Sequence, residues 1–130
     1  MQPWVLVADD DTEIRATLRD ILSEAGCVVL EARDGVQALE TLRTAAQPLV
    51  ILLDLRMPKL DGMGVLNAVA SDARLAHRHA FILITANDKT LPLAFVHLLT
   101  ELAVPVLPKP FDVDTLLDVV DAAYARLPKS

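Results

Sequence analysis

The segment 49–62 restricts the fold of this chain more than any other stretch of its sequence. Its first five residues, LVILL, are apolar and lead directly into the carboxylate of Asp54. This pattern is typical of a strand that is buried on both faces and ends at an acid. Pro58 and the Asp61-Gly62 pair then predict a turn. We therefore expect Asp54 to lie at the rim of a sheet, where a ligand can reach it.

Short apolar runs alternate with segments of helical periodicity along the whole chain. Runs rich in β-branched residues predict strands, and apolar residues that recur every three or four positions predict helices. Five strand-plus-helix units in succession predict an α/β fold, a five-stranded, doubly wound parallel sheet with helices on both faces. The predicted strands are 4–8, 28–32, 49–53, 80–84 and 104–107, and the predicted helices are 14–25, 35–42, 65–69, 91–102 and 113–126.

Local features refine this prediction at several positions. Asp11 or Thr12 is expected to cap the first helix, and Val36 is expected to face the core from the second helix. We expect a polar loop through Asp72 and Arg74 after the third helix. Pro105 favours an edge position for the last strand, because an edge strand can lack one hydrogen-bond donor.

Composition and charge bound the possible functions. The 130 residues fit a single domain, 1–130, and 53% of them are hydrophobic, which supplies a packed core. Twelve Lys and Arg against 18 Asp and Glu give a net charge of −6, which argues against direct binding to nucleic acid. A lone cysteine, Cys27, and a start without a signal pattern favour a cytoplasmic location. Charged residues and prolines interrupt the longest apolar region, 91–108, so we expect no membrane insertion.

Polar side chains follow four of the predicted strands. They are Asp9 and Asp10, Asp54, Thr85, and Lys109. The carboxyl ends of parallel strands meet at one edge of a sheet, where ligands bind, so these side chains are expected to converge. Three close carboxylates raise one another's pKa unless a cation joins them, and an all-oxygen ligand set is typical of Mg²⁺.

A bound Mg²⁺ would make phosphoryl transfer to Asp54 chemically reasonable. The carboxylate would act as the nucleophile, and the ammonium group of Lys109 would offset charge on the transferred oxygens. The hydroxyl of Thr85 would donate to one of these oxygens. The expected product is an acyl phosphate on Asp54.

In combination, these motifs resemble the receiver domains of two-component response regulators over essentially the whole chain. The matching motifs are Asp9-Asp10, Asp54 with Met57-Pro58 and Asp61-Gly62, Thr85-Ala86, and Lys109-Pro110-Phe111. The resemblance implies a flavodoxin-like fold and a phosphoacceptor domain that is not an enzyme. It also implies a histidine kinase or phosphotransfer protein as donor, and a downstream protein partner.

The resemblance assigns a role to each site residue. Asp54 would be the phosphoacceptor, while Thr85 and Lys109 would bind the phosphoryl group. Asp10 would bind Mg²⁺ directly and Asp9 through water, together with Asp54 and the backbone carbonyl of Arg56. The peptide bond between Lys109 and Pro110 is typically cis in this family.

Two positions depart from the family pattern, and both concern signal output. Val106 stands where receivers usually carry a Tyr or Phe that moves on activation, and Leu102-Ala103 replaces a usual Gly-Ala pair. The predicted helix 91–102 is apolar around most of its circumference. We therefore expect some of its apolar surface to be exposed and to serve a partner, with a homodimer through the fourth helix and fifth strand as one form. The residues concerned are Leu91, Leu93, Phe95, Val96, Leu98, Leu99 and Leu102.

Alternative functions stay open at this stage. A pseudo-receiver, which has the fold without regulated switching, is suggested by Val106. An aspartate-nucleophile phosphatase also places an acid after a buried strand, but such enzymes usually carry a second Asp two residues later, where this chain has Arg56. His77, Arg78 and His79 are interpreted as solvent-facing charge without a metal role.

Overall fold

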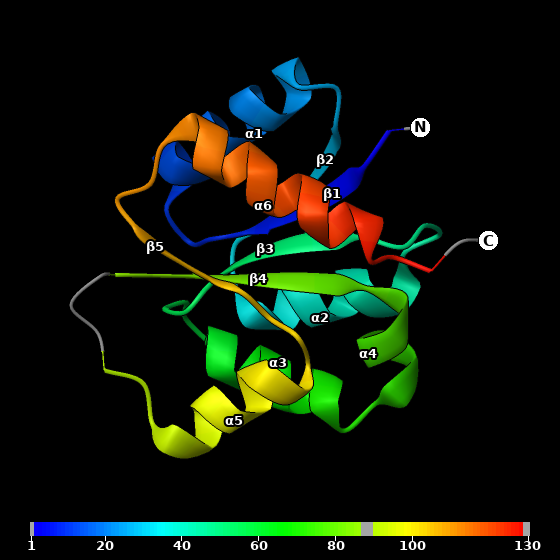
Figure 1. The fold of residues 1–130 in the computed structure, drawn as a ribbon, viewed down its shortest axis with the longest axis vertical. Coiled ribbons are helices and arrows are strands. Elements are labelled where there is room, and N and C mark those ends of the chain that lie inside the picture. Colours follow the sequence, from blue (N-terminus) through cyan, green and yellow to red (C-terminus); the bar gives the residue numbers. More distant parts are fainter. Residues whose placement is uncertain (1, 87–89, 129–130) are drawn as a thin grey trace.

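Five parallel strands form the centre of the protein (Figure 1), which we describe from a computed structural model covering residues 2–86 and 90–128. The strands lie in the order β2-β1-β3-β4-β5, so the chain reverses its direction across the sheet between β1 and β3. The predicted α/β fold with a doubly wound parallel sheet is confirmed. The strands are β1 (Trp4–Ala8), β2 (Val28–Ala32), β3 (Val50–Asp54), β4 (Ala80–Ala86) and β5 (Val106–Lys109).

Helices cover both faces of the sheet (Figure 1). α1 and α6 pack on one face, and α2, α3, α4 and α5 pack on the other. Alternate strand residues point to opposite faces, so each strand feeds both cores. In β1, for example, Leu6 joins the core under α2 and α3, while Val5 and Val7 join the core under α1 and α6. The helices are α1 (Thr12–Glu24), α2 (Gly35–Thr44), α3 (Gly62–Ala70), α4 (Ala73–Arg78), α5 (Leu93–Glu101) and α6 (Val113–Ala125).

Side-chain caps begin most of these helices. Asp11 accepts hydrogen bonds from the main-chain N–H groups of Glu13 and Ile14, as expected for the N-cap of α1. Asp61 caps α3 in the same way through the N–H of Gly64. The last two helices of the sequence differ, since α6 is capped by Asp112 and α5 has no side-chain cap.

The structure corrects two local predictions. The expected polar loop through Asp72 and Arg74 is the start of α4, which Asp72 caps. Val36 is 51% exposed instead of facing the core, because α2 turns Leu39 and Leu42 toward the sheet. The prediction missed α4 because a six-residue helix spans less than two turns and shows no readable apolar period.

His79 also contradicts the prediction, since its side chain is buried instead of facing solvent. Its Nδ1 accepts a hydrogen bond from the main-chain N–H of Leu49 (3.0 Å), and its Nε2 lies 3.0 Å from the carbonyl oxygen of Leu42. The imidazole therefore joins the start of β3 to the end of α2. These partners come from distant segments, so no local pattern indicates them.

The last strand is shifted by two residues from its predicted position. β5 begins at Val106 instead of residue 104, and it forms an edge of the sheet, as Pro105 suggested. Ala103, just beyond α5, has a φ of 54°, a left-handed conformation that glycine adopts more readily. No helix among the described residues is long and apolar enough to cross a membrane.

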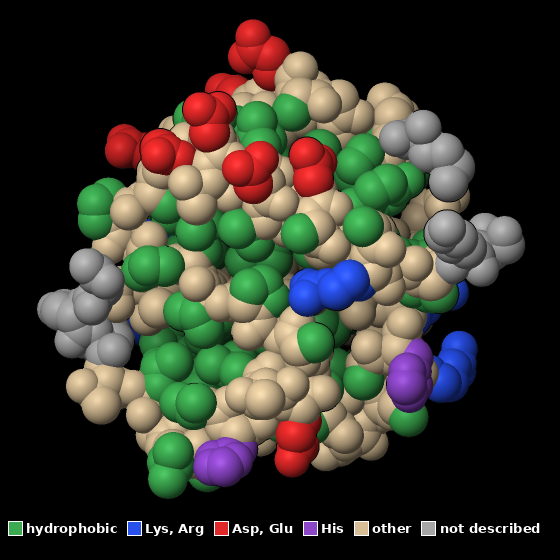
Figure 2. All heavy atoms as spheres, in the orientation of Figure 1, with side chains coloured by type: hydrophobic (Ala, Val, Ile, Leu, Met, Phe, Trp, Pro, Cys, Tyr) green, Lys and Arg blue, Asp and Glu red, His purple; other side chains and the backbone are tan. Residues whose placement is uncertain are grey.

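Acidic side chains are concentrated on one part of the face seen in Figure 2, whereas apolar side chains are spread more widely. The acidic groups gather at the upper part, over α1 and α6, and a group of apolar side chains lies at the lower left, over α5. Phe95 and Leu99 of α5 are buried, while Leu93 and Val96 are 73% and 41% exposed. The expectation that part of this helix's apolar surface remains exposed is therefore confirmed.

Candidate functional site

The sheet brings the predicted site residues together at the carboxyl ends of its strands. Asp9 directly follows β1, Asp54 ends β3, Thr85 lies near the end of β4, and Lys109 ends β5. At this end of the sheet β1 and β3 lie side by side, and the strand order reverses between them. Sheets of this kind bind ligands at that point. Four segments far apart in the sequence thus contribute to one site.

Three carboxylates form the acidic part of the site. Asp9, Asp10 and Asp54 each offer an oxygen atom, and these atoms lie within 4.8 Å of one another. Asp9 is buried, whereas Asp10 is exposed to solvent. Such a group of oxygen donors, partly open to solvent, has the chemistry that a hard divalent cation prefers.

One oxygen of Asp9 lacks the partner that its burial requires. Its Oδ1 accepts a hydrogen bond from the main-chain N–H of Asp11 (2.9 Å). Its Oδ2 is buried and accepts no hydrogen bond from any residue that the structure describes, and the Nζ atom of Lys109 lies 3.9 Å away. A buried carboxylate oxygen without a donor is costly, so this atom needs a further ligand. A cation or a water bound to one would satisfy it.

The pKa values of the buried carboxyl groups reflect the same crowding. Burial, together with the neighbouring Asp9, raises the pKa of Asp54 to about 6, although the ammonium of Lys109 lies only 3.8 Å from its Oδ2. Burial also raises the pKa of Asp9, and the hydrogen bond from Asp11 opposes that rise. Positive charge placed among these groups would favour their ionised forms.

Asp54 lies between two hollows of different character. The larger, about 520 Å³, is lined by the carboxylates of Asp9 and Asp10. The smaller, about 150 Å³, is lined by Thr85 and Ala86. Asp54, Arg56 and Lys109 line both hollows. The carboxylate of Asp54 can therefore meet a cation on one side and an anionic group on the other.

The backbone around the site holds these side chains in place. The main-chain N–H of Arg56 points to Asp54 Oδ1 at 3.4 Å, a long hydrogen bond. The side chain of Thr85 is buried beside the smaller hollow. The peptide bond between Lys109 and Pro110 is cis, as the resemblance implied.

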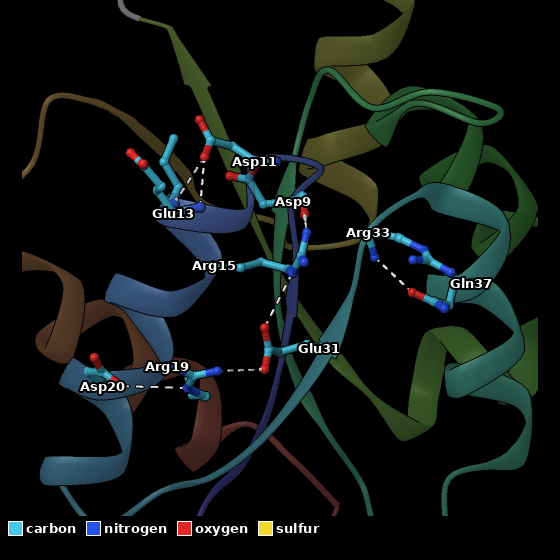
Figure 3. Close-up of polar contacts among 10 residues, drawn as sticks. Asp9, Asp11, Glu13, Arg15, Arg19, Asp20, Glu31, Arg33 and Gln37 are labelled. Carbon is cyan, nitrogen blue, oxygen red and sulfur yellow. Dashed lines mark hydrogen bonds and ion pairs between the residues drawn. The ribbon is translucent and has the colours of Figure 1, made fainter.

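Arg15 supports the site and was not predicted from the sequence. Its Nη1 donates a hydrogen bond to the main-chain oxygen of Asp9 (2.7 Å), and its Nε donates to Glu31 on β2 (3.2 Å). Arg19, one turn further along α1, pairs with the other oxygen of Glu31 at 3.3 Å (Figure 3). The network holds the backbone at Asp9 to α1 and β2. Sequence alone carried no signal for it, because it depends on how α1 packs beside β2.

Comparison with known proteins places the chain in a family. A model described as "Response regulator receiver domain" matches residues 5–121. The probable chemotaxis protein CheY of Rhizobium etli is 34% identical over 125 residues, which cover 95% of this chain and 93% of that protein. The receiver domain of the Francisella response regulator 1452 has a similar structure, with a TM-score of 0.81, 32% identity, and coverage of 96% of this chain and 98% of that one.

Some relatives are much longer than this chain. The DNA-binding transcriptional regulator NtrC of Escherichia coli is 34% identical over 125 residues, which cover 94% of this chain but 25% of NtrC. This chain thus spans about a quarter of that relative. The activities of the longer proteins are therefore properties of those proteins.

Proposed function

We propose that this chain, which belongs to the family of response regulator receiver domains, accepts a phosphoryl group on the carboxylate of Asp54. The donor is a histidine kinase or a phosphotransfer protein of a two-component system. The observation that carries this proposal is the position of Asp54 between an acidic hollow and a hollow lined by Thr85 and Lys109. A carboxylate that serves only solubility would not be buried between these two environments.

The acidic hollow is suited to Mg²⁺, which receiver domains bind at such clusters. The donors would be Asp9, Asp10 and Asp54, with the main-chain carbonyl of Arg56. Asp10 is the direct ligand in this proposal and Asp9 binds through water. Asp10→Ala should therefore weaken Mg²⁺ binding more than Asp9→Ala does. The bound ion supplies positive charge next to the reacting oxygens.

The proposed transfer forms one bond and breaks one. An oxygen of Asp54 attacks phosphorus, and the bond from phosphorus to the imidazole nitrogen of the donor histidine breaks, with its electron pair leaving on that nitrogen. The product is an acyl phosphate on Asp54. The ammonium of Lys109 and the hydroxyl of Thr85 lie at the smaller hollow, where they offset charge on the phosphoryl oxygens.

Labelling with acetyl phosphate tests this proposal directly. The parent protein should gain one phosphoryl group in the presence of Mg²⁺ and none in EDTA, as measured by intact-protein mass spectrometry. Asp54→Asn should not be labelled, whereas Asp118→Asn, which changes an exposed aspartate of α6, should behave like the parent. Full metal-dependent labelling of Asp54→Asn would show that another residue is the acceptor. A parent that is never labelled would favour the pseudo-receiver alternative.

The neighbourhood of Asp54 does not favour the phosphatase alternative. Such enzymes usually carry an Asp two residues after the nucleophile as general acid, and Arg56 occupies that position here. Arginine stays protonated at all physiological pH values and cannot give a proton to a leaving group.

The proposed output surface is formed by α5 and β5. It presents the exposed apolar side chains of Leu93, Val96 and Val106, while Phe95 and Leu99 are buried and cannot contact a partner. We include a homodimer through this surface in the proposal. Sedimentation of the parent and of Val96→Glu, each with and without acetyl phosphate, tests it. Monomers under all conditions would exclude self-association and leave a different protein as the partner.

A further inference from the structure

The loop between β3 and α3, which follows Asp54, is closed by two main-chain hydrogen bonds, one at its base and one around its tip. The main-chain N–H of Gly62 donates to the carbonyl oxygen of Leu55 (2.8 Å), and the N–H of Leu60 donates to that of Pro58 (2.7 Å). Lys59, at the tip, has a φ of 68°, in the left-handed region that non-glycine residues seldom occupy. Such a conformation persists where surrounding contacts hold it. The tip of this loop therefore needs an anchor outside the loop.

The anchor is the N-terminus of α2. A methyl group added at Gly35, the first residue of α2, would overlap the carbonyl oxygen of Leu60 and lie 2.7 Å from its carbonyl carbon. These are backbone atoms, which cannot rotate away as a flexible side chain can. Loop and helix are thus in contact main chain to main chain, and glycine is required at this position.

A single carboxylate reinforces this contact. Asp34, the N-cap of α2, is buried, and its Oδ1 accepts a hydrogen bond from the main-chain N–H of Gln37 (2.8 Å). Its Oδ2 lies 3.7 Å from the Nζ atom of Lys59. The hydrogen bond from Gln37, with the ammonium of Lys59, keeps the pKa of Asp34 below its usual range. Asp34 therefore caps the helix and holds the strained residue of the loop at the same time.

We infer that Asp34, Gly35 and Lys59 form a clamp that positions the main chain of Arg56 for metal binding. Arg56 lies in the loop between its closed base and its anchored tip, and its N–H reaches Asp54. This inference rests on the proposed function, in which the carbonyl of Arg56 binds Mg²⁺. The three clamp residues are positioning residues, because they act through the loop and not on the ion.

The clamp contributes to loop position more than to stability. The side chain of Lys59 is 69% exposed, and ion pairs so open to solvent stabilise a fold very little. Loss of a group that orients a metal ligand, in contrast, typically weakens metal affinity by roughly tenfold or more. Metal affinity and stability should therefore respond differently when the clamp is broken.

Calorimetric titration with Mg²⁺ separates the two effects. Gly35→Ala should bind Mg²⁺ roughly tenfold more weakly than the parent. The matched control is Gly26→Ala, after α1, where glycine has a φ of 95° and no atom lies within 4 Å of an added methyl group. Both variants should unfold at a lower temperature in EDTA, but Gly26→Ala should keep the parent's Mg²⁺ affinity. Equal weakening in both variants would reduce the effect to lost stability and overturn the clamp.

Variants of the ion pair test the clamp even if Gly35→Ala fails to fold. Asp34→Asn keeps a capping oxygen on α2 and loses only the charge. It and Lys59→Met should each weaken Mg²⁺ binding several-fold, and Lys59→Arg should restore the parent's affinity. A parent that binds no Mg²⁺ would overturn the proposed function and the clamp together. A parent that binds Mg²⁺, with Asp34→Asn and Lys59→Met matching it, would overturn the role of the ion pair in the clamp while leaving the proposed function intact.

Discussion

Replacing Asp54 by asparagine should make the metal-free protein more stable at neutral pH. Burial and the nearby Asp9 raise the pKa of Asp54 from 3.8 to about 6 in the folded protein. The unfolded chain exposes this carboxyl group and returns its pKa to the ordinary value. Between these two values the folded protein binds more protons than the unfolded chain, so stability falls as the pH rises through this window. The penalty is complete above about pH 6.

The size of the effect follows from the two pKa values. The difference between 3.8 and about 6 corresponds to about 3 kcal/mol, at about 1.4 kcal/mol per pKa unit. Little solvent screens the charge, because the side chain of Asp54 is 13% exposed. The variant loses the ion pair with Lys109, which offsets part of the gain. We therefore expect Asp54→Asn to raise the free energy of unfolding by roughly 1–3 kcal/mol at pH 8, and by much less at pH 4.

Urea unfolding followed by circular dichroism measures this difference. The parent, Asp54→Asn and the control Asp118→Asn are compared in EDTA at both pH values. Saturating Mg²⁺ should close the gap, because ligand binding at a hundredfold excess over the dissociation constant stabilises the parent by about 2.7 kcal/mol. Equal stability of parent and Asp54→Asn in EDTA at pH 8 would refute the reasoning. A gap of the same size at pH 4 would refute it as well.

Three further predictions concern Lys109, His79 and Ala103. Lys109→Ala should still be labelled by acetyl phosphate but should no longer change its assembly or partner binding, because it lacks the ammonium group that moves from the carboxylates to the phosphoryl group. Sedimentation before and after labelling checks this, and a parent-like response would contradict it. Burial lowers the pKa of His79 below 6.5 in the folded protein, so just below that pH the unfolded chain binds more protons than the folded protein does. The stability that neutral His79 contributes is therefore present above pH 6.5 and declines as the pH falls. His79→Gln cannot titrate and should cost about 1–3 kcal/mol at pH 7.5, and urea unfolding should show a smaller difference from the parent at pH 5.5; a constant difference would count against this. Ala103→Gly should raise the free energy of unfolding by about 0.5–1 kcal/mol, because a left-handed conformation costs an L-residue about 1–2 kcal/mol, and the greater backbone entropy of glycine in the unfolded chain offsets part of this gain. Thermal unfolding measures the difference, and a lower free energy of unfolding in the variant would contradict a strained backbone at Ala103.

The sequence alone was sufficient to predict the sheet and the residues at its edge. Strands buried on both faces must be apolar throughout, so LVILL before Asp54 and FILI before Thr85 were readable without tertiary information. The polar residue that ends such a run lies at the rim, and parallel strands bring their rims together. For this reason the carboxylate group and Lys109 were predicted as a set, and the structure places them within reach of one another.

Only the tertiary structure decided which side chains are buried and which partners they contact, because these depend on segments that are distant in the sequence. Helix α5 is apolar on most sides, so its sequence does not indicate which side is covered. Packing against the rest of the fold buries Phe95 and leaves Leu93 exposed to solvent. The same holds for His79, whose two partners lie 30 and 37 residues away in the chain. The contact of Gly35 with Leu60 likewise joins the start of α2 to the loop after β3, and the two segments carry no shared pattern. Local periodicity reports the apolar character of a segment, whereas burial and partner choice are set by whichever segments the folded chain brings beside it.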